Sequence, residues 1–355
     1  MSVFKNRAER FAAIDELAKT KILVLDGAMG SLIQGLGFKE DDFRGSHLAN
    51  HNMPLQGNHD LLSITQPQAI QQLHEDYFEA GIDIVETNTF NAQRISQADY
   101  GLEKYCYEMN KASAEIARAA ADKYETKAAP KLVAGALGPT NKTLSMSPKV
   151  ADPAYRDVSY EEVVEAYREQ ALGLIDGGAD VLLIETIFDT LNAKAAIYAI
   201  QSVFDERGEV LPIMISGTIT DMSGRTLSGQ TVEAFYNSVR HANPWSIGLN
   251  CALGPKQMRQ FLADLARVAQ TKISCHPNAG LPNAFGGYDE TPHDMCEVIG
   301  GWAKDNMVNI VGGCCGTTPA HIKHIAQGVA GVNPRTIPNF DTALRLSGLE
   351  PFVHA

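Results

Sequence analysis

The sequence predicts an α/β fold in which eight parallel strands and the helices between them form one (β/α)8 TIM barrel. Three observations lead to this prediction. Short, unbroken apolar runs recur along the chain, as is typical of strands buried on both faces of a parallel sheet. Amphipathic segments with helix start and stop signals lie between these runs. Neither G-x-G-x-x-G nor G-x-x-x-x-G-K-[ST] occurs, which counts against a doubly wound nucleotide-binding sheet.

The apolar runs are the predicted strands. In chain order they are ILVLD (22–26), IDIVET (82–87), KLVAGAL (131–137), DVLLIET (180–186), IMISGT (213–218), SIGLN (246–250), KISCHP (272–277) and NIVGGC (309–314). They alternate with helical segments without a break in composition, so one domain is favoured over two. We expect the barrel to cover residues 10–330.

Helix signals accompany the strands. At Thr65-Gln66-Pro67 we expect Thr65 to cap a helix, Pro67 to lie in its first turn and Gly81 to end it. Thr318-Pro319 is a second start of this kind. The N-terminal twenty residues also have an amphipathic helical pattern. Further helices are expected over residues 160–178, 190–208, 231–242 and 255–270.

Two segments interrupt this alternation. Residues 35–66 are rich in Gly, His and Asn, and we expect an irregular flap over the barrel mouth. Residues 331–355 contain three prolines and no helical period, so we expect an extended tail or linker.

The composition excludes several classes of protein. Of 355 residues, 45% are hydrophobic, and 42 acidic residues against 30 basic ones give a net charge of −12. So acidic a chain lacks the basic surface of a nucleic-acid or anionic-membrane binder. Six cysteines are too few for a disulfide framework. Neither a signal peptide nor an apolar run near the roughly 20 residues of a membrane helix is present. We expect a cytoplasmic protein.

Polar residues gather where the predicted strands end, which is the functional face of a TIM barrel. Three of them are cysteines: Cys251 follows the sixth strand, and Cys314 and Cys315 end the eighth. Adjacent residues in a strand point to opposite faces, so both members of the pair reach one metal only if the backbone turns. Glycines within 312–316 would permit the necessary dihedral angles. Three thiolates suit Zn²⁺, and an open fourth position is the catalytic arrangement.

Other interpretations of the cysteines and histidines stay open. The three thiols could all be buried core residues, and Cys275 is a rival ligand because its strand lies between the sixth and the eighth. Cys106 and Cys296 are expected to be packing residues. His321 and His324 lie on the last helix without a partner motif, so we expect a solvated or capping role for both.

A second set of residues suggests a pocket for a zwitterion. After the first strand, residues 26–30 (DGAMG) are small enough to present backbone N–H groups to a carboxylate. Asp26 and Glu185 could pair with an ammonium group. Taken alone, either acid could instead cap a helix or form a salt bridge. No role is predicted for Glu86.

Longer motifs resemble a known family. They are LDGAMGSLIQ (25–34), ETNTFNAQ (86–93), LGPTNKT (137–143), IETIFDTLNAKAA (184–196), ISGTITDMSGRTLSGQT (215–231), GLNCALGP (248–255), HPNAGLPNAFGGYDE (276–290) and NIVGGCCGTTPAHI (309–322). Over about residues 10–350 the chain resembles the homocysteine S-methyltransferase family, and most closely the N-terminal module of cobalamin-dependent methionine synthases. RLSGLEP (345–351) is similar to the linker that leads there into a folate-binding module, so we expect a piece of a larger modular enzyme.

The resemblance implies a ligand set and a reaction. Zinc would be held by Cys251, Cys314 and Cys315, and would activate homocysteine as a thiolate. The thiolate would take a methyl group from methylcobalamin, giving methionine. Cobalamin and methyltetrahydrofolate would be bound by other modules of the same polypeptide. The matching homocysteine-binding positions are Asp26, the amides of Ala28 and Met29, Glu185, and, with less defined roles, Asn88 and Asn250.

Three alternatives remain. The chain could be a free-standing homocysteine S-methyltransferase that uses betaine or S-methylmethionine as donor. It could be a binding module with a structural zinc, for which four protein ligands including Cys275 would be expected. It could also act on a thiol other than homocysteine.

Overall fold

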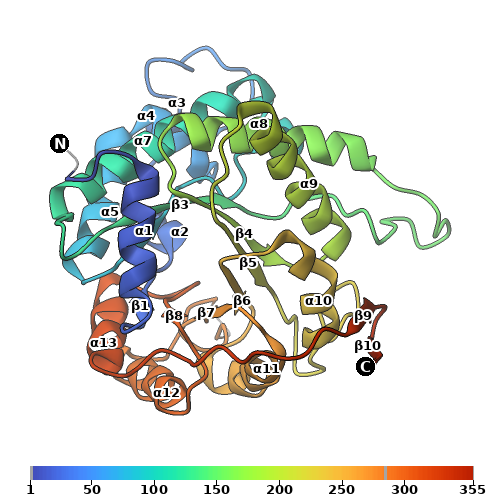
Figure 1. Cartoon of the computed structure of the whole chain (residues 1–355). Helices are drawn as coiled ribbons and strands as arrows, with labels where there is room; N and C mark the ends of the chain where they lie inside the picture. Colours follow the sequence, from blue (N-terminus) through green and yellow to red (C-terminus); the bar gives the residue numbers. More distant parts are fainter. Residues whose placement is uncertain (1–2, 284–285, 355) are drawn as a thin grey trace.

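The computed structural model describes residues 3–283 and 286–354, so two residues of the HPNAGLPNAFGGYDE motif lie outside the described part. Its centre is a sheet of eight parallel strands surrounded by helices (Figure 1). All eight predicted strands are confirmed. Their bounds are β1 Leu23–Val24, β2 Ile84–Glu86, β3 Leu132–Leu137, β4 Val181–Ile187, β5 Ile213–Gly217, β6 Ser246–Asn250, β7 Lys272–His276 and β8 Ile310–Val311.

The sheet closes into a barrel. From β2 to β8 each strand pairs with the next, and β8 pairs with β1 through Leu23 and Ile310. The remaining seam, between β1 and β2, is joined by a bridge from Leu25 to Ile84 and by the Asp83 N–H, which donates to the Val24 carbonyl at 2.7 Å. The predicted (β/α)8 fold is therefore confirmed.

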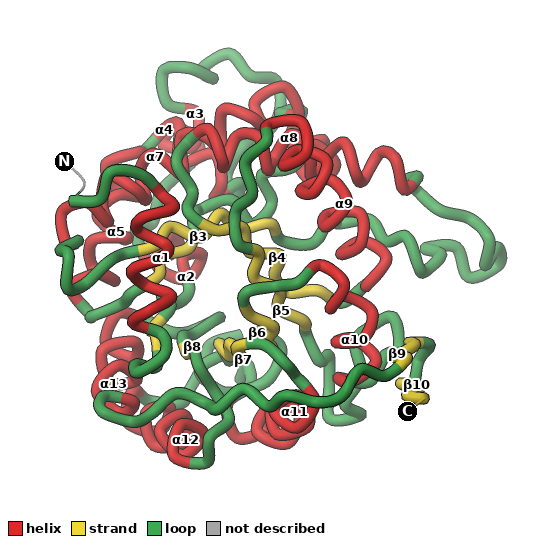
Figure 2. The backbone as a smooth tube through the Cα atoms, in the orientation of Figure 1, coloured by secondary structure: helices red, strands yellow, loops and turns green. Residues whose placement is uncertain are grey.

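Helices form the outer layer (Figure 2). They are α5 Pro67–Glu79, α7 Cys106–Tyr124, α8 Tyr160–Asp176, α9 Thr190–Arg207, α10 Val232–Val239, α11 Pro255–Val268, α12 Pro292–Lys304 and α13 Pro319–Val329. One predicted cap is wrong: Gln66 is the N-cap residue of α5, and Thr65 instead ends the short helix α4 (Leu62–Thr65). Leu61 and Leu62 are fully buried. The packing of these two side chains keeps the chain in a helical turn as far as Thr65, so Thr65 cannot cap α5.

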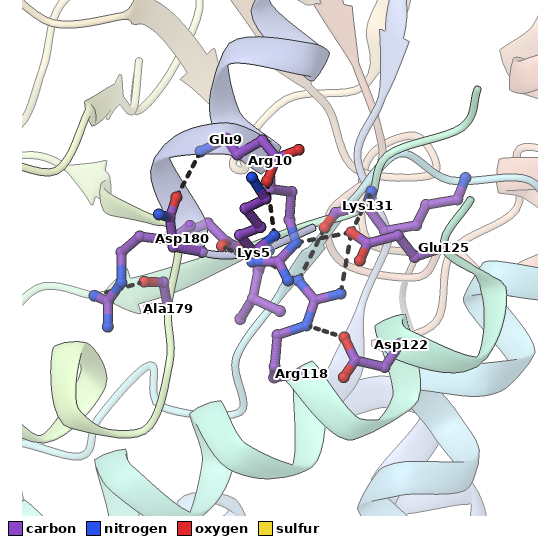
Figure 3. Close-up of polar contacts among 12 residues, drawn as sticks. Lys5, Glu9, Arg10, Arg118, Asp122, Glu125, Lys131, Ala179 and Asp180 are labelled. Carbon is purple, nitrogen blue, oxygen red and sulfur yellow. Dashed lines mark hydrogen bonds and ion pairs between the residues drawn. The ribbon is translucent and has the colours of Figure 1, made fainter. Parts of the chain in front are cut away.

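The N-terminal helix α1 (Arg7–Leu17) lies over the barrel near β1 (Figure 1). Ile14 packs with interior side chains such as Leu23 and Leu183. Beside it, buried Arg10 donates to Glu125 at 2.7 Å and to Asp180 at 2.6 Å (Figure 3). A buried charge needs such partners. Because Arg10 meets both acids at one place on the barrel, the position of α1 is well defined.

The insertion at 35–66 is folded, so the prediction that it is irregular is wrong, whereas its predicted place over the barrel mouth agrees with His59 and Asp60, which line the cavity there. It begins at the end of α2 (Met29–Gly35) and contains α3 (Glu40–Arg44), the 3₁₀ helix η1 (His59–Leu61) and α4. Its apolar side chains, among them Phe43, Leu48 and Leu55, form a buried cluster with residues of α5 and α7. They have no regular spacing in the sequence, so periodicity could not reveal them.

The C-terminal segment is only partly extended. Residues 333–343 have no regular secondary structure and run past α12 and α11 (Figure 2). A hairpin of β9 (Leu344–Ser347) and β10 (Pro351–His354) follows and packs on α10. This hairpin was not predicted from the sequence. Gln230 donates to the Gly348 carbonyl at 2.8 Å and so fixes the turn. Within the described residues, no helix is long and apolar enough to cross a membrane.

Candidate metal and substrate site

A cavity of about 250 Å³ opens at the carboxyl ends of the strands. Its lining comes from the loops after β1, β2, β4, β6, β7 and β8, and from the insertion. Of the residues predicted for the site, it is lined by Asp26, Ala28, Met29, Asn88, Glu185, Cys251, Cys314 and Cys315. Asn250 is the one predicted site residue that does not line it.

The three predicted metal ligands lie together. The Sγ of Cys315 is 3.8 Å from that of Cys251 and 4.0 Å from that of Cys314. Thiolates about 2.3 Å from Zn²⁺ lie about 3.8 Å apart at the corners of a tetrahedron. The spacing and the donor type therefore both fit a zinc ion, with the fourth position left to another ligand.

Backbone turns bring the thiols together. Cys251 and Ala252, directly after β6, both have left-handed φ angles, 61° and 59°. Around the Cys pair only Gly316 has a positive φ, at 79°. The expectation of unusual dihedrals at Gly312 and Gly313 is wrong: these glycines permit close approach instead. A Cβ on Gly313 would lie 2.5 Å from the Thr317 hydroxyl.

Negative charge in the cluster concentrates on one thiol, because the pKa of Cys315 is lowered whereas that of Cys251 is raised to about 11 and that of Cys314 is also raised. Hydrogen bonds from the thiols of Cys251 and Cys314, and then from Tyr288, lower the pKa of Cys315 to about 3. Cys275 differs, because its thiol donates to the Met258 sulfur at 3.2 Å and burial raises its pKa. It lies outside the metal-binding group, so the rival assignment to Cys275 finds no support.

Four other residues considered in the sequence also lie outside the cavity lining: Cys106, Cys296, His321 and His324. Cys106 is buried in α7, and Cys296 packs against Gly328 of α13. His321 caps α13, since its Nδ1 accepts the Thr318 N–H at 3.2 Å. His324 is exposed and bonds only within its own helix. The predicted packing, capping and solvated roles are confirmed.

Three acids line the cavity: Asp26 and Glu185 are buried, and Glu86 is half-buried. Asp26 accepts the Glu86 N–H at 3.0 Å. Burial, followed by mutual repulsion, raises the pKa of Glu86 above its usual value, and burial raises that of Glu185 to about 7. No lysine or arginine is among the residues described in this lining. The cavity therefore favours a cationic ligand.

A β-bulge directs Glu185 into the cavity. The register between β4 and β5 shifts between Ile184 and Ile187, and Thr186 has a φ of 54°. Asn250 holds this turn: it accepts the Thr186 N–H at 3.0 Å and donates to the Thr186 hydroxyl at 2.7 Å. Because its side chain is fully buried and engaged, Asn250 supports Glu185 and does not face the cavity, contrary to the expected substrate contact.

Some of the other groups predicted to bind substrate already make hydrogen bonds within the protein. The Ala28 N–H already donates to the Thr317 hydroxyl at 3.1 Å, whereas Met29 is the first residue of α2, where backbone N–H groups lack helical acceptors. Asn88 lines the cavity, but its amide donates to the His59 carbonyl at 2.8 Å. It thereby ties the insertion to β2.

Four titratable residues of the lining had no predicted role in the site. Glu86 and His276 end β2 and β7, and their position at strand ends was the available signal. His276 is 2% exposed, its Nε2 has no partner, and burial lowers its pKa to about 3. His59 and Asp60 come from the insertion, whose sequence gave no indication of their location.

Known proteins resemble this chain in sequence and in fold. A sequence model of the homocysteine S-methyltransferase family matches residues 23–329. Crystal structures of the homocysteine methyltransferase MmuM from Escherichia coli share the barrel fold. The oxidized form has a TM-score of 0.69 and 22% identity, covering 90% of this chain and 99% of that one. The metallated form has a TM-score of 0.69 and 23% identity, covering 88% and 98%. Since the family match spans most of the sequence, this chain is a methyltransferase that belongs to the homocysteine S-methyltransferase family.

Proposed function

We propose that the chain binds homocysteine at a three-cysteine zinc site and methylates its sulfur, giving methionine. The observation that carries this proposal is the spacing of the Cys251, Cys314 and Cys315 thiols, which fits a zinc ion, beside an acidic cavity. We further propose that it serves as the homocysteine-activating module of a cobalamin-dependent methionine synthase, which the motif resemblance supports.

Different groups of the protein would bind the zinc ion, the ammonium group and the carboxylate of the substrate. The three cysteines would hold Zn²⁺, leaving one position toward the cavity. Zn²⁺ when bound supplies Lewis acidity that lowers the pKa of the substrate thiol, which is otherwise mostly protonated at neutral pH. Asp26 and Glu185 would bind the ammonium group, and the backbone of Ala28 and Met29 would bind the carboxylate. With the thiol proton already lost, no protein group is needed as a general base.

The reaction is a displacement at a methyl carbon. The homocysteine sulfur forms the new S–C bond while the bond from methyl to donor breaks and its electron pair leaves with the donor. With methylcobalamin the leaving group is cob(I)alamin. The cobalamin-binding and methyltetrahydrofolate-binding modules of the same polypeptide would present and regenerate this donor.

The test is a comparison of methyl donors on the zinc-loaded chain. We expect methionine from homocysteine with methylcobalamin, slowly because no tethered module raises its local concentration. Methyltetrahydrofolate alone should give none. Faster turnover with S-methylmethionine or betaine would favour the free-standing alternative. A structural-zinc module would be indicated if X-ray absorption showed no additional sulfur neighbour at zinc after homocysteine is added.

A further inference from the structure

The loop after β5 connects the end of β4 to the C-terminal hairpin. This loop, residues 218–231, makes hydrogen bonds to the chain that follows β4 and also to the turn between β9 and β10. The hairpin itself lies beside α10 (Figure 1). Neither the loop nor the hairpin has a role in the proposed reaction so far.

Towards the cavity, the loop holds the chain that follows Glu185. The Ser228 N–H donates to the Phe188 carbonyl at 3.0 Å. The Thr190 hydroxyl donates to Oε1 of Gln230 at 2.7 Å. These contacts come directly after the β-bulge that directs Glu185 into the cavity, so the loop supports the bulge from its C-terminal side.

Towards the hairpin, the same loop holds the turn between β9 and β10. The Thr231 N–H donates to the Leu349 carbonyl at 3.0 Å. Arg225 forms an ion pair with Glu350, which lies one residue before β10. The loop is therefore bonded on both sides, to the end of β4 and to the hairpin.

Gln230 joins these two sides through one side chain. Its Oε1 accepts the hydrogen bond from Thr190, while its Nε2 donates to the Gly348 carbonyl at 2.8 Å and lies 3.1 Å from the Ser347 hydroxyl. The residue is 8% exposed. Because both ends of the planar amide are engaged, contact with the hairpin also sets the orientation in which the amide meets Thr190.

The hairpin is held mainly by polar contacts. None of the residues of β9 and β10 is buried, and Leu344, Leu346 and Phe352 each stay more than half exposed. An element that buries so little apolar surface opens more readily than the core does. Its position therefore depends on the hydrogen bonds of Gln230 and Ser347 and on the ion pair of Glu350.

We propose that Gln230 is a positioning residue for the substrate site, and that through it the attached hairpin raises the affinity of the chain for homocysteine. The bulge needs such support, because Thr186 has a left-handed φ of 54° and strained conformations persist only where the surroundings hold them. When the hairpin detaches, the Gln230 amide is free to turn away from Thr190 and the bulge loses a support. The inference rests on the proposed function, in which Glu185 binds the substrate ammonium group.

Variants of the hairpin alone give the first test. In the cobalt-substituted chain, thiol binding is followed by the sulfur-to-cobalt charge-transfer band. The double variant Ser347→Ala/Glu350→Gln should weaken homocysteine binding about fivefold or more, as is typical of coupled sites. Gln230→Leu should have the same effect. Neither should change the affinity for 4-mercaptobutanoate, which lacks the amine, by more than about twofold, since Glu185 does not bind this ligand.

Ser202→Ala/Asp305→Asn is the matched control. It also removes one hydroxyl and one ion pair, but Ser202 bonds only to a carbonyl of its own helix and the exposed Asp305 pairs with Arg259. This variant should bind both thiols as the wild-type chain does. Cobalt content is measured in every variant and should stay at one ion per chain.

Hydrogen exchange of the wild-type chain gives the second test. Coupling of binding free energies is reciprocal, so bound homocysteine must stabilise the attached hairpin by the same factor that detachment costs in affinity. Saturating homocysteine should therefore slow amide exchange in residues 344–354 about fivefold or more. Saturating 4-mercaptobutanoate should not slow it.

Three results would overturn the proposal. The first is unchanged homocysteine affinity in both the double variant and Gln230→Leu. The second is an equal loss of affinity for both thiols, which indicates general loosening of the barrel mouth. The third is hairpin exchange that homocysteine leaves unaltered. Absence of a charge-transfer band with homocysteine in the wild-type chain would refute the proposed function and this inference with it, a result distinct from thiol binding that is independent of the hairpin.

Discussion

Backbone strain at single residues is concentrated in the site. Of the five non-glycine residues described with positive φ, Thr186, Cys251 and Ala252 adjoin the cavity or the thiol cluster. Such conformations cost about 1–3 kcal/mol each, and they persist where the surroundings hold them. Here the Asn250 side chain and the β6–β7 ladder do so. The positions of the thiol and carboxylate groups are thus built into the fold before any ligand arrives.

The first prediction at this scale concerns the cysteines. Cys251→Ala, Cys314→Ala and Cys315→Ala should each abolish tight zinc binding, because two thiols leave the tetrahedral set incomplete. Cys275→Ala is the matched control and should retain one zinc per chain, since its thiol contacts Met258 instead. Metal analysis after dialysis against a chelator measures both. Full zinc content in all three single variants, or its loss in the Cys275 variant, would refute the ligand assignment.

The second prediction for a single residue concerns Asp60, a buried acid of the insertion. Burial raises the pKa of its carboxyl from 3.8 to about 6, against an opposing hydrogen bond from the Asn91 N–H. The folded chain therefore binds this proton more tightly than the unfolded chain. The resulting stability is fully present below about pH 4 and is lost as the pH rises through about 6.

Asp60→Asn cannot ionise but keeps an oxygen for the Asn91 N–H. Relative to wild type, the variant should gain free energy of unfolding as the pH rises from 4 to 7, by roughly 1–3 kcal/mol. Urea unfolding of the zinc-free proteins across this range measures the difference. A difference that stays constant, or that shrinks with rising pH, would mean that Asp60 does not carry a raised pKa.

At the scale of elements, α1 is fastened to the barrel by charge as well as by apolar contact. Arg10 links α1 to Glu125 and Asp180, and Arg118 of α7 contacts the same two acids at 3.4 and 3.0 Å (Figure 3). Removing one partner from a buried ion pair costs about 3–5 kcal/mol. Because Arg118 stays in place, Arg10→Met should cost somewhat less, about 2–3 kcal/mol of unfolding free energy.

Lys19, just after α1, provides the control, since its ion pair with Glu16 is exposed to solvent. Lys19→Met should change the stability by roughly 0.5 kcal/mol or less. Urea denaturation of both variants gives the comparison. Similar small losses in the two variants would show that the buried network does not hold the helix.

The elements also show what sequence could and could not predict. Strands such as β4 were predictable because continuous apolar residues meet a helix layer on one face and the barrel interior on the other. The insertion and the β9–β10 hairpin were not, since their folding depends on scattered apolar contacts and on α10. Asn250 was placed at the right strand end, but a strand-end side chain can turn toward its neighbour, and only the structure shows which way it faces.

At the scale of the whole molecule, the site combines groups that are distant in sequence. The thiols were predictable because parallel strands end on one face, which brings residues after β6 and β8 together. The family match over residues 23–329 covers the cysteines, the acids and the insertion alike. His59 and Asp60 reach the cavity only through the packing of the insertion against α5 and α7, which no local pattern indicates.

The pairing of β8 with β1 has a consequence for synthesis on the ribosome. The first strand is synthesised early, but its ladder with β8 can form only after the last strand is made, because Leu23 pairs with Ile310. Cys314 and Cys315 follow that partner by a few residues. While residues 252–313 are being made, a growing chain therefore carries Cys251 without the other two thiols and cannot assemble the three-thiol cluster. Binding of a metal ion by the three thiols would thus be postponed until the ring has closed, and a nascent chain would not bind the ion prematurely.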